Sequence, residues 1–193
     1  MRPKPSSLQN RRARKLAFAA WFVAAGLWAL GQLAGLTGLR LNETPSVPTG
    51  LWRVLALDGS VKRGQIVSIC PPPAPVFAEA HTRGYLAKGR CPGGLQPMLK
   101  PVAAIGGDVV QKTPQGVTVN GALVPHSLAL AADSQGRPLP VFGPGPAVIG
   151  RNEIFLLSGM NERSFDSRYF GPLPASMVEG IAIPVWTASA GAQ

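Results

Sequence analysis

Apolar and polar positions divide this chain into one long apolar stretch and a region of short alternating runs. Residues 16–39 contain no charged side chain, and Gln32 is the only strongly polar one among them. A run of about 20 apolar residues is long enough to span the hydrocarbon core of a bilayer. The pattern therefore predicts one N-terminal transmembrane helix over residues 16–39, which separates an arm of residues 1–15 from a domain of residues 40–193.

Short runs of β-forming residues fill the predicted domain and alternate with Gly and Pro clusters, which is typical of strands joined by turns. The predicted strands cover residues 51–56, 65–70, 98–105, 108–112, 116–119, 122–124, 147–149, 153–157 and 178–186. Asn120-Gly121 is flanked by β-formers and favours a two-residue type I′ hairpin turn. Residues 71–97 and 125–146 are Pro- and Gly-rich insertions, the first with a short helix within 74–86. The fold class is therefore mostly β, with turns made by many of the 20 prolines and 23 glycines.

Positive charge is concentrated in the N-terminal arm. The formal net charge is +10, yet residues 43–193 carry 12 basic and 9 acidic side chains. A nucleic-acid-binding domain needs a basic stripe on its folded part, so no nucleic-acid partner is expected. Because basic flanks stay in the cytoplasm, the arm is expected there and the domain on the far side of the membrane. A cleaved secretory signal is the alternative, although its apolar region is shorter, roughly 7–15 residues.

The two cysteines fit an exported domain. Cys70 ends an apolar strand and Cys91 lies in a Gly-rich loop. An even number of cysteines outside the cytoplasm favours one disulfide, here between Cys70 and Cys91. A zinc site that adds His81 is the alternative, but two cysteines and one histidine without paired spacing are weak evidence for metal.

Ser46 and Lys100 are the candidate catalytic pair. Ser46 lies between Pro45 and Pro48, and proline restricts the backbone of its neighbours, which gives this turn a defined shape. Lys100 lies in the apolar run 98–105. Burial lowers the pKa of a lysine, and the neutral amine can then take the proton of a serine hydroxyl. The ordinary alternatives are a Ser/Pro linker and a strand lysine that reaches solvent.

A polar run over residues 158–172 directly follows an apolar strand and supplies possible support. The hydroxyl of Ser164 or Ser167 could orient the lysine amine. Asp166 and Arg168 are two residues apart and could pair to brace neighbouring turns. An ordinary polar loop is the alternative.

Four segments together resemble the type I signal peptidases, which are membrane-anchored serine proteases with a Ser-Lys dyad. They are, in chain order, Ser46-Val47-Pro48-Thr49, Arg63-Gly64-Gln65-Ile66-Val67, Lys100 through Gly107-Asp108, and Ser164-x-Asp166-Ser167-Arg168-Tyr169-Phe170-Gly171. The resemblance covers the predicted anchor and residues 41–186. The Pro-Ser-x-Pro-x-Gly-Leu segment and the Cys-Pro-Pro at 70–72 are similar to the conjugative-transfer, TraF-type branch.

The resemblance implies an antiparallel β-sheet domain of the signal-peptidase and LexA-like type. It implies a serine endopeptidase that needs no cofactor or metal, with Ser46 as nucleophile and Lys100 as general base. The oxyanion is expected to bind the Ser46 backbone N–H and the Thr44 hydroxyl. The supporting residues are expected to be Ser164, Asp166, Ser167 and Arg168.

The expected function is the processing of exported proteins, in particular pilin maturation for conjugative transfer. Cleavage is one outcome of the acyl-enzyme, and cyclisation by transpeptidation is the other. The expected partners are a membrane-tethered preprotein or pilin and the lipid bilayer, with the catalytic domain in the periplasm and the single span in the bacterial inner membrane. The alternatives are a general type I signal peptidase, a soluble repressor-type autoprotease and a non-catalytic component of a secretion channel.

Overall fold

The computed structural model describes residues 7–143 and 145–188, and the chain divides into two compact units, Met1–Leu39 and Arg40–Gln193. In the first unit, α1 (Ser7–Leu36) covers most of the predicted anchor. Within the described part of the chain, no helix is long and apolar enough to cross a membrane, so the transmembrane helix predicted over residues 16–39 is not found. The side chains of residues 30 and 32–36 of that prediction, and residues 1–6 of the predicted arm, lie outside the described residues.

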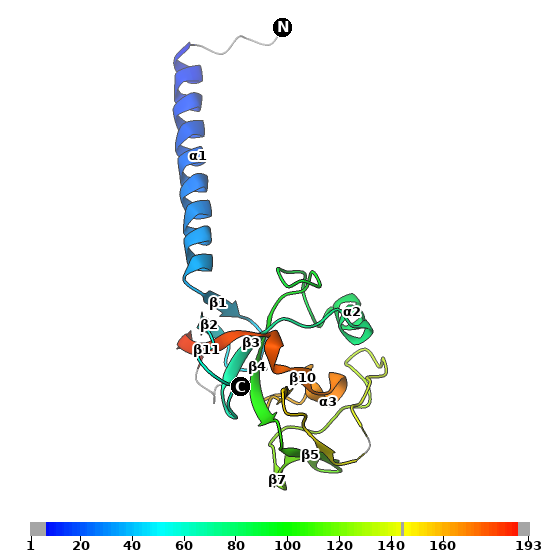
Figure 1. Cartoon of the computed structure of the whole chain (residues 1–193). Coiled ribbons are helices and arrows are strands. Elements are labelled where there is room, and N and C mark those ends of the chain that lie inside the picture. The colour runs from blue at the N-terminus through cyan, green and yellow to red at the C-terminus, as the bar shows by residue number, and fades with distance from the viewer. Residues whose placement is uncertain (1–6, 144, 189–193) are drawn as a thin grey trace. The chain divides into compact units, whose positions relative to one another are not determined.

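The second unit is built mainly of antiparallel strands (Figure 1). One sheet has seven strands in the order β1-β2-β11-β3-β4-β9-β10, and its neighbouring pairs from β2 to β10 are antiparallel. Its strands are β1 (Leu39–Asn42), β2 (Gly50–Leu55), β3 (Ile66–Ile69), β4 (Met98–Ile105), β9 (Glu153–Leu156), β10 (Leu173–Pro174) and β11 (Val178–Thr187). The predicted mostly-β, antiparallel fold is confirmed.

A second sheet has four strands in the order β7-β6-β5-β8. They are β5 (Val109–Thr113), β6 (Gly116–Val119), β7 (Ala122–Leu123) and β8 (Ala147–Val148). The predicted Asn-Gly hairpin joins β6 and β7, with φ of 50° at Asn120 and 84° at Gly121. A type I′ turn needs positive φ at both central residues, which explains the choice of Asn and Gly.

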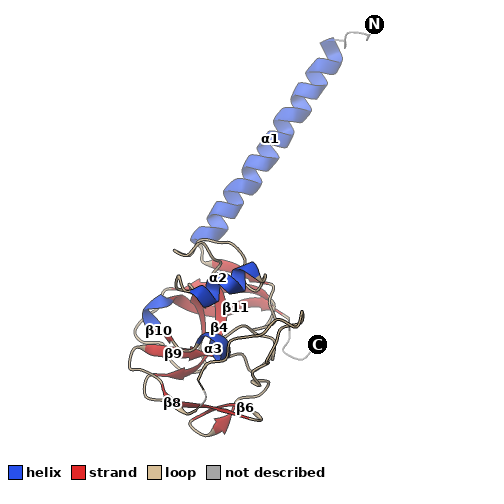
Figure 2. Ribbon diagram, turned by 90° about the vertical axis from the view of Figure 1, so that its right-hand side faces the viewer, coloured by secondary structure: helices blue, strands red, loops and turns tan. Residues whose placement is uncertain are grey.

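Short helical segments accompany the sheets (Figure 2). In the first insertion, α2 (Pro75–Thr82) lies inside the predicted helical range, with proline in its first turn, where no intrahelical N–H is needed. Sequence patterns did not predict α3 (Ser167–Phe170) or the 3₁₀ helix η1 (Ala175–Met177), because each spans only one turn. They also missed β1 and β10, which are short strands at the two edges of the large sheet.

The main hydrophobic core joins the large sheet to α2. Its buried side chains include Val67, Ile69 and Leu156 from the sheet and Phe77 from α2. The Phe77 ring centroid is 5.0 Å from that of Phe170 and 6.3 Å from that of Phe165. The helix of the first insertion thereby packs on the segment that follows β9, and it fixes that segment relative to β3 and β4.

Candidate active site

Ser46 lies in the tight connection between β1 and β2, and its side chain is almost fully buried, with 5% of the residue exposed. The turn is anchored on the C-terminal side of the serine. Val47 packs against Trp52 in a small core of its own, and the Trp52 indole N–H donates a hydrogen bond of 2.9 Å to the Pro48 carbonyl. A rigid turn of this kind presents the serine hydroxyl in one geometry.

The side chain of Asn42 stabilises the same turn from within. Its amide donates to the carbonyl oxygens of Thr44, Val47 and Pro48 at 2.8, 3.1 and 3.1 Å. Its carbonyl oxygen accepts from the backbone N–H of Thr44 at 3.3 Å. Sequence reasoning missed this residue, because a single asparagine four positions before a serine carries no recognisable signal.

Lys100 reaches Ser46 from the middle of β4. Side chains of β4 alternate between buried and half-buried, and Lys100, opposite Val67 of β3, occupies a buried position that is 6% exposed. The Lys100 Nζ lies 2.6 Å from Ser46 Oγ and 2.8 Å from Ser164 Oγ. The strand alternation therefore aims an amine at the serine hydroxyl instead of at solvent.

Burial changes the chemistry of this amine. It lowers the pKa of Lys100 from an ordinary 10.5 to about 8, while the Asp166 carboxylate raises the pKa and the Arg168 guanidinium lowers it. A low-dielectric surrounding disfavours the ammonium form, because the charge loses its hydration. A pKa of about 8 gives a substantial fraction of neutral amine near neutral pH, which a general base requires.

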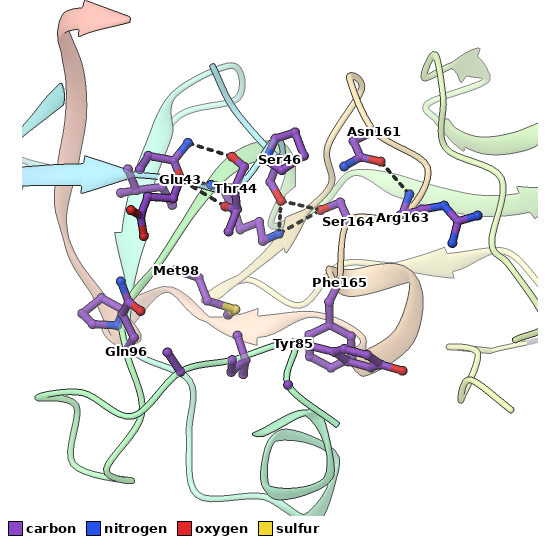
Figure 3. A pocket seen from close by; sticks show the side chains of 18 of the residues that line it. Glu43, Thr44, Ser46, Tyr85, Gln96, Met98, Asn161, Arg163, Ser164 and Phe165 are labelled. Carbon is purple, nitrogen blue, oxygen red and sulfur yellow. Dashed lines mark hydrogen bonds between the residues drawn. The ribbon is translucent and has the colours of Figure 1, made fainter. Parts of the chain in front are cut away.

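Ser164 completes a triangle of hydrogen-bonding groups with Ser46 and Lys100 (Figure 3). It lies between β9 and α3, is 3% exposed, and its hydroxyl oxygen is 3.1 Å from that of Ser46. Of the two serines that the sequence offered, the structure brings Ser164 to the amine. Ser167 Oγ instead accepts the Leu156 backbone N–H at 2.9 Å, so it ties α3 to β9.

Asp166 and Arg168 form an ion pair with no exposed side-chain surface, and the distance from Arg168 Nε to Asp166 Oδ1 is 2.8 Å. Arg168 also donates to the Ser164 carbonyl at 3.0 Å. Asp166 accepts the Ser158 backbone N–H at 3.1 Å. A buried pair needs such extra hydrogen bonds to offset its desolvation. The pair therefore braces the two segments that carry Ser164 and Ser158.

Ser158 is a further residue that sequence reasoning did not assign to the site. It is fully buried, and its hydroxyl donates a hydrogen bond of 2.7 Å to the carbonyl oxygen of Ser46. The Met160 backbone N–H donates to the same hydroxyl at 3.3 Å. The segment that follows β9 thus holds the backbone of the serine turn directly. The available sequence signal for Ser158 was the polar run that begins after an apolar strand.

The predicted oxyanion partner Thr44 lies two residues before Ser46 and lines a cavity together with it. Its hydroxyl donates to Asn42 Oδ1 at 3.0 Å, so it must rotate about its side-chain bond to reach an oxyanion. The role of Thr44 stays a prediction.

Cys70 directly follows β3, Cys91 lies in the first insertion, and the two are joined to each other. Cys70 and Cys91 form a disulfide with a Cα–Cα distance of 5.4 Å. The zinc alternative loses both sulfur ligands to this bond, and His81 Nδ1 lies 2.7 Å from the Leu86 carbonyl oxygen. In the described residues no group of three or more His, Cys, Asp and Glu side chains is arranged to hold a metal ion.

A cavity of about 620 Å³ opens in front of Ser46, Lys100 and Ser164. Its apolar lining includes Tyr85, Leu86, Met98, Leu99, Leu130, Leu139 and Phe165. In Figure 3, Tyr85 and Phe165 lie across the pocket from Thr44 and Ser46. A cavity of this size takes several residues of an extended peptide, with a nucleophile and a base at one wall.

The sequence matches a known family over most of its length. The model of signal peptidase, peptidase S26, matches residues 13–187. The chain belongs to this signal peptidase family. A signal peptidase I from Enterococcus faecalis is similar at 19% identity with a TM-score of 0.37, covering 64% of this chain and 97% of that one.

Similar proteins come from plasmid transfer systems. A plasmid transfer protein TraF of Escherichia coli is 44% identical over 170 residues, which cover 86% of this chain and 94% of that protein. A conjugal transfer protein TraF of Agrobacterium tumefaciens is 43% identical over 181 residues, covering 93% and 98%. A probable conjugal transfer protein TraF of Sinorhizobium fredii is 40% identical over 184 residues, covering 93% and 95%. The predicted TraF-type resemblance is confirmed, and the family supports a peptidase role.

Proposed function

We propose that this signal peptidase family member is a serine endopeptidase in which Ser46 is the nucleophile and Lys100 the general base. The observation that carries the proposal is the buried Lys100 amine, 2.6 Å from Ser46 Oγ and with its pKa lowered to about 8. Family membership supports a peptidase, and the triangle with Ser164 gives this peptidase its proton acceptor.

In the first half-reaction, Ser46 Oγ attacks the carbonyl carbon of the scissile peptide bond while its proton moves to the neutral amine of Lys100. The oxyanion binds the Ser46 backbone N–H and the rotated Thr44 hydroxyl. Loss of one such donor typically costs about 10²–10³ in kcat. When the tetrahedral intermediate collapses, the C–N bond breaks, and the Lys100 ammonium gives its proton to the leaving amine.

In the second half-reaction, the acyl group leaves Ser46. A water molecule attacks the ester carbonyl, Lys100 takes a proton from this water, and the Ser46 oxygen recovers its proton as the ester bond breaks. An amine can replace the water, and a new amide bond then forms. If that amine is the amino terminus of the same substrate, the product is cyclic.

The proposed substrate is an exported protein, specifically the pilin subunit of a conjugative transfer apparatus. Support for it comes from the relatives, whose names place them in plasmid and conjugal transfer. The disulfide supports an oxidising compartment, because such bonds persist outside the reducing cytoplasm. We therefore place the catalytic domain in the bacterial periplasm at the inner membrane, and fractionation of cells that express the full chain tests both the compartment and the membrane attachment.

The dyad is tested by pilin maturation in cells that carry the full-length chain and the pilin of the same transfer system. Ser46→Ala and Lys100→Ala should each reduce maturation by about 10³-fold or more, because the nucleophile and its base act as a unit. Ser176→Ala and Lys112→Ala change exposed residues of the same types and serve as controls. Normal maturation in either dyad variant, at wild-type protein level, would refute the assignment.

A general signal peptidase is distinguished by a second assay. Cells depleted of their own signal peptidase accumulate unprocessed preproteins, and a dedicated pilin peptidase should leave that accumulation unchanged. Restored growth and bulk processing on expression of this chain would instead identify general leader-peptide removal as its function.

A further inference from the structure

The wall of the cavity that faces the catalytic serine is made by the two long insertions. Residues 84–87, 96 and 97 come from the first insertion, and Leu130, Asp133 and Leu139 come from the second. These insertions are far apart in the sequence, and neither contributes to the Ser46, Lys100 and Ser164 triangle. The shape of the cavity therefore depends on how the insertions are held together.

The two insertions are joined through a cluster of three side chains, Tyr85, Asp133 and Arg137. We call this cluster the insertion clasp. The Tyr85 hydroxyl donates a hydrogen bond to Asp133 Oδ2 across the two insertions. The Arg137 Nε donates to the same carboxylate at 2.6 Å, and the guanidinium lies 5.7 Å from the Tyr85 ring centroid. One carboxylate thus binds both insertions.

Asp133 is built into its own loop as well. Its other carboxylate oxygen accepts the backbone N–H groups of Gln135 and Arg137, each at 2.9 Å. Only 7% of the Asp133 side chain is exposed. Desolvation raises the pKa of this carboxyl, but the hydrogen bonds from Tyr85 and Arg137 outweigh it and hold the pKa well below its usual range. The carboxylate of the clasp is therefore charged at neutral pH.

The clasp positions an apolar surface in the cavity. The Tyr85 ring lies 5.6 Å from Phe165, which stacks at 6.0 Å on Tyr169. The Tyr169 hydroxyl in turn accepts the Leu130 backbone N–H at 3.1 Å. Phe165 directly follows Ser164, so the wall and the catalytic segment have fixed relative positions.

We propose that the insertion clasp determines substrate specificity by fixing the position of Tyr85 in the cavity wall. The site then accepts an extended peptide that places a large apolar side chain against Tyr85, Leu86 and Leu130. It disfavours a peptide with a charged side chain at that position. The proposal rests on the proposed peptidase function and adds the feature that selects its substrates. An apolar side chain loses water against this wall, whereas a carboxylate held against Tyr85, Leu86 and Leu130 would lose its hydration to apolar surface.

The experiment uses the full-length protein and a set of fluorogenic peptides in which each position near the cleaved bond is in turn Ala, Leu or Asp. Active sites are first counted by the burst from a small p-nitrophenyl ester. Wild-type protein should prefer Leu over Asp at one position by at least tenfold in kcat/KM. Asp133→Ala and the milder Tyr85→Phe should reduce that preference several-fold, mainly through KM, while Asp58→Asn, an exposed carboxylate, should retain it.

The outcomes separate the two proposals. An active wild-type protein with no preference at any position, or with the same preference in both clasp variants, would overturn the role of the clasp alone. Tyr85→Phe removes only a hydroxyl and keeps the ring, so it gives a result even if Asp133→Ala does not fold. A wild-type protein with neither an ester burst nor peptide cleavage would overturn the proposed function and the specificity inference with it.

Discussion

At the scale of single residues, the site depends on the protonation state of one amine. Lys100 donates to two serine hydroxyl oxygens when it is charged, and it can accept the Ser46 proton only when it is neutral. Its burial in β4 disfavours the charged form and brings the pKa to about 8. The neighbouring ion pair of Asp166 and Arg168 does not replace this effect, because its two charges act on the amine in opposite directions.

The first prediction is therefore a pH profile. The kcat/KM for peptide cleavage should rise as the pH increases through about 8 and level off above it, because only the neutral amine of Lys100 acts as base. Single-turnover measurements between pH 6 and 10 on a fluorogenic peptide test this. A flat profile over the same range would contradict the assignment of Lys100 as the titrating base.

Ser158 gives a second prediction at this scale. Ser158→Ala leaves the buried Ser46 carbonyl without its 2.7 Å hydrogen bond, so unfolding should become easier by about 1–3 kcal/mol. The displaced serine turn should lower kcat by roughly tenfold to a hundredfold with a smaller change in KM. Urea denaturation and steady-state kinetics measure the two effects, with the exposed Ser176→Ala as control. Wild-type kcat in a folded Ser158→Ala variant would show that the turn needs no support from β9.

At the scale of elements, a strand positions Lys100, and the two insertions form the cavity wall that faces Ser46. Lys100 gains its direction from the alternation of β4, whereas Ser46 and Ser164 lie in connections held by hydrogen bonds. The first insertion adds α2 and the disulfide, which tie Tyr85 back to the large sheet. The triangle of Ser46, Lys100 and Ser164 and the cavity wall are thus supported by different parts of the chain.

The disulfide gives the prediction for this scale. Replacing both Cys70 and Cys91 by alanine opens a loop with a sequence separation of 21 and should lower the free energy of unfolding by about 3 kcal/mol. Because the loop contains Tyr85, KM for peptides should rise more than kcat falls. Denaturation in the presence and absence of a reductant measures this, since the reductant should affect only the wild-type protein. Equal stability of the two proteins without reductant would contradict the prediction.

At the scale of the whole molecule, the buried amine of Lys100 carries a cost in stability. The pKa of Lys100 is about 8 in the folded protein and 10.5 in the unfolded chain. The unfolded chain therefore binds more protons between these two values, and stability rises with pH in that range. One pKa unit corresponds to about 1.4 kcal/mol, so the cost below pH 8 is about 3 kcal/mol.

A matched variant tests this cost. Lys100→Met keeps an unbranched buried side chain, one atom shorter, and removes the titrating group. Between pH 8 and 10.5, the free energy of unfolding of the wild-type protein should increase by about 3 kcal/mol relative to Lys100→Met. Urea denaturation of both proteins at several pH values gives the difference directly. Parallel curves for the two proteins would mean that Lys100 has an ordinary pKa in the folded state.

The sequence by itself determined the elements whose cause is local. The apolar run 98–105 predicted β4, and the positive φ that Asn-Gly tolerates predicted the β6–β7 hairpin, whereas the burial of Lys100 within β4 is known only from the structure. The even cysteine count predicted the Cys70–Cys91 pairing. Four short segments in the right order were enough to predict the family, because a sequence motif can be recognised without knowing where the fold places its residues.

Only the tertiary structure decided which polar groups meet. Ser46 and Ser164 are 118 positions apart, and Ser158 and Ser46 are 112 apart, so their contacts exist only once the sheet has formed. The choice of Ser164 over Ser167, the support from Asn42 and the insertion clasp depend in the same way on closure across the sheet. The physical reason is that periodicity records which face of an element is buried, whereas a hydrogen bond needs two specific atoms within about 3 Å, which chain folding alone brings together.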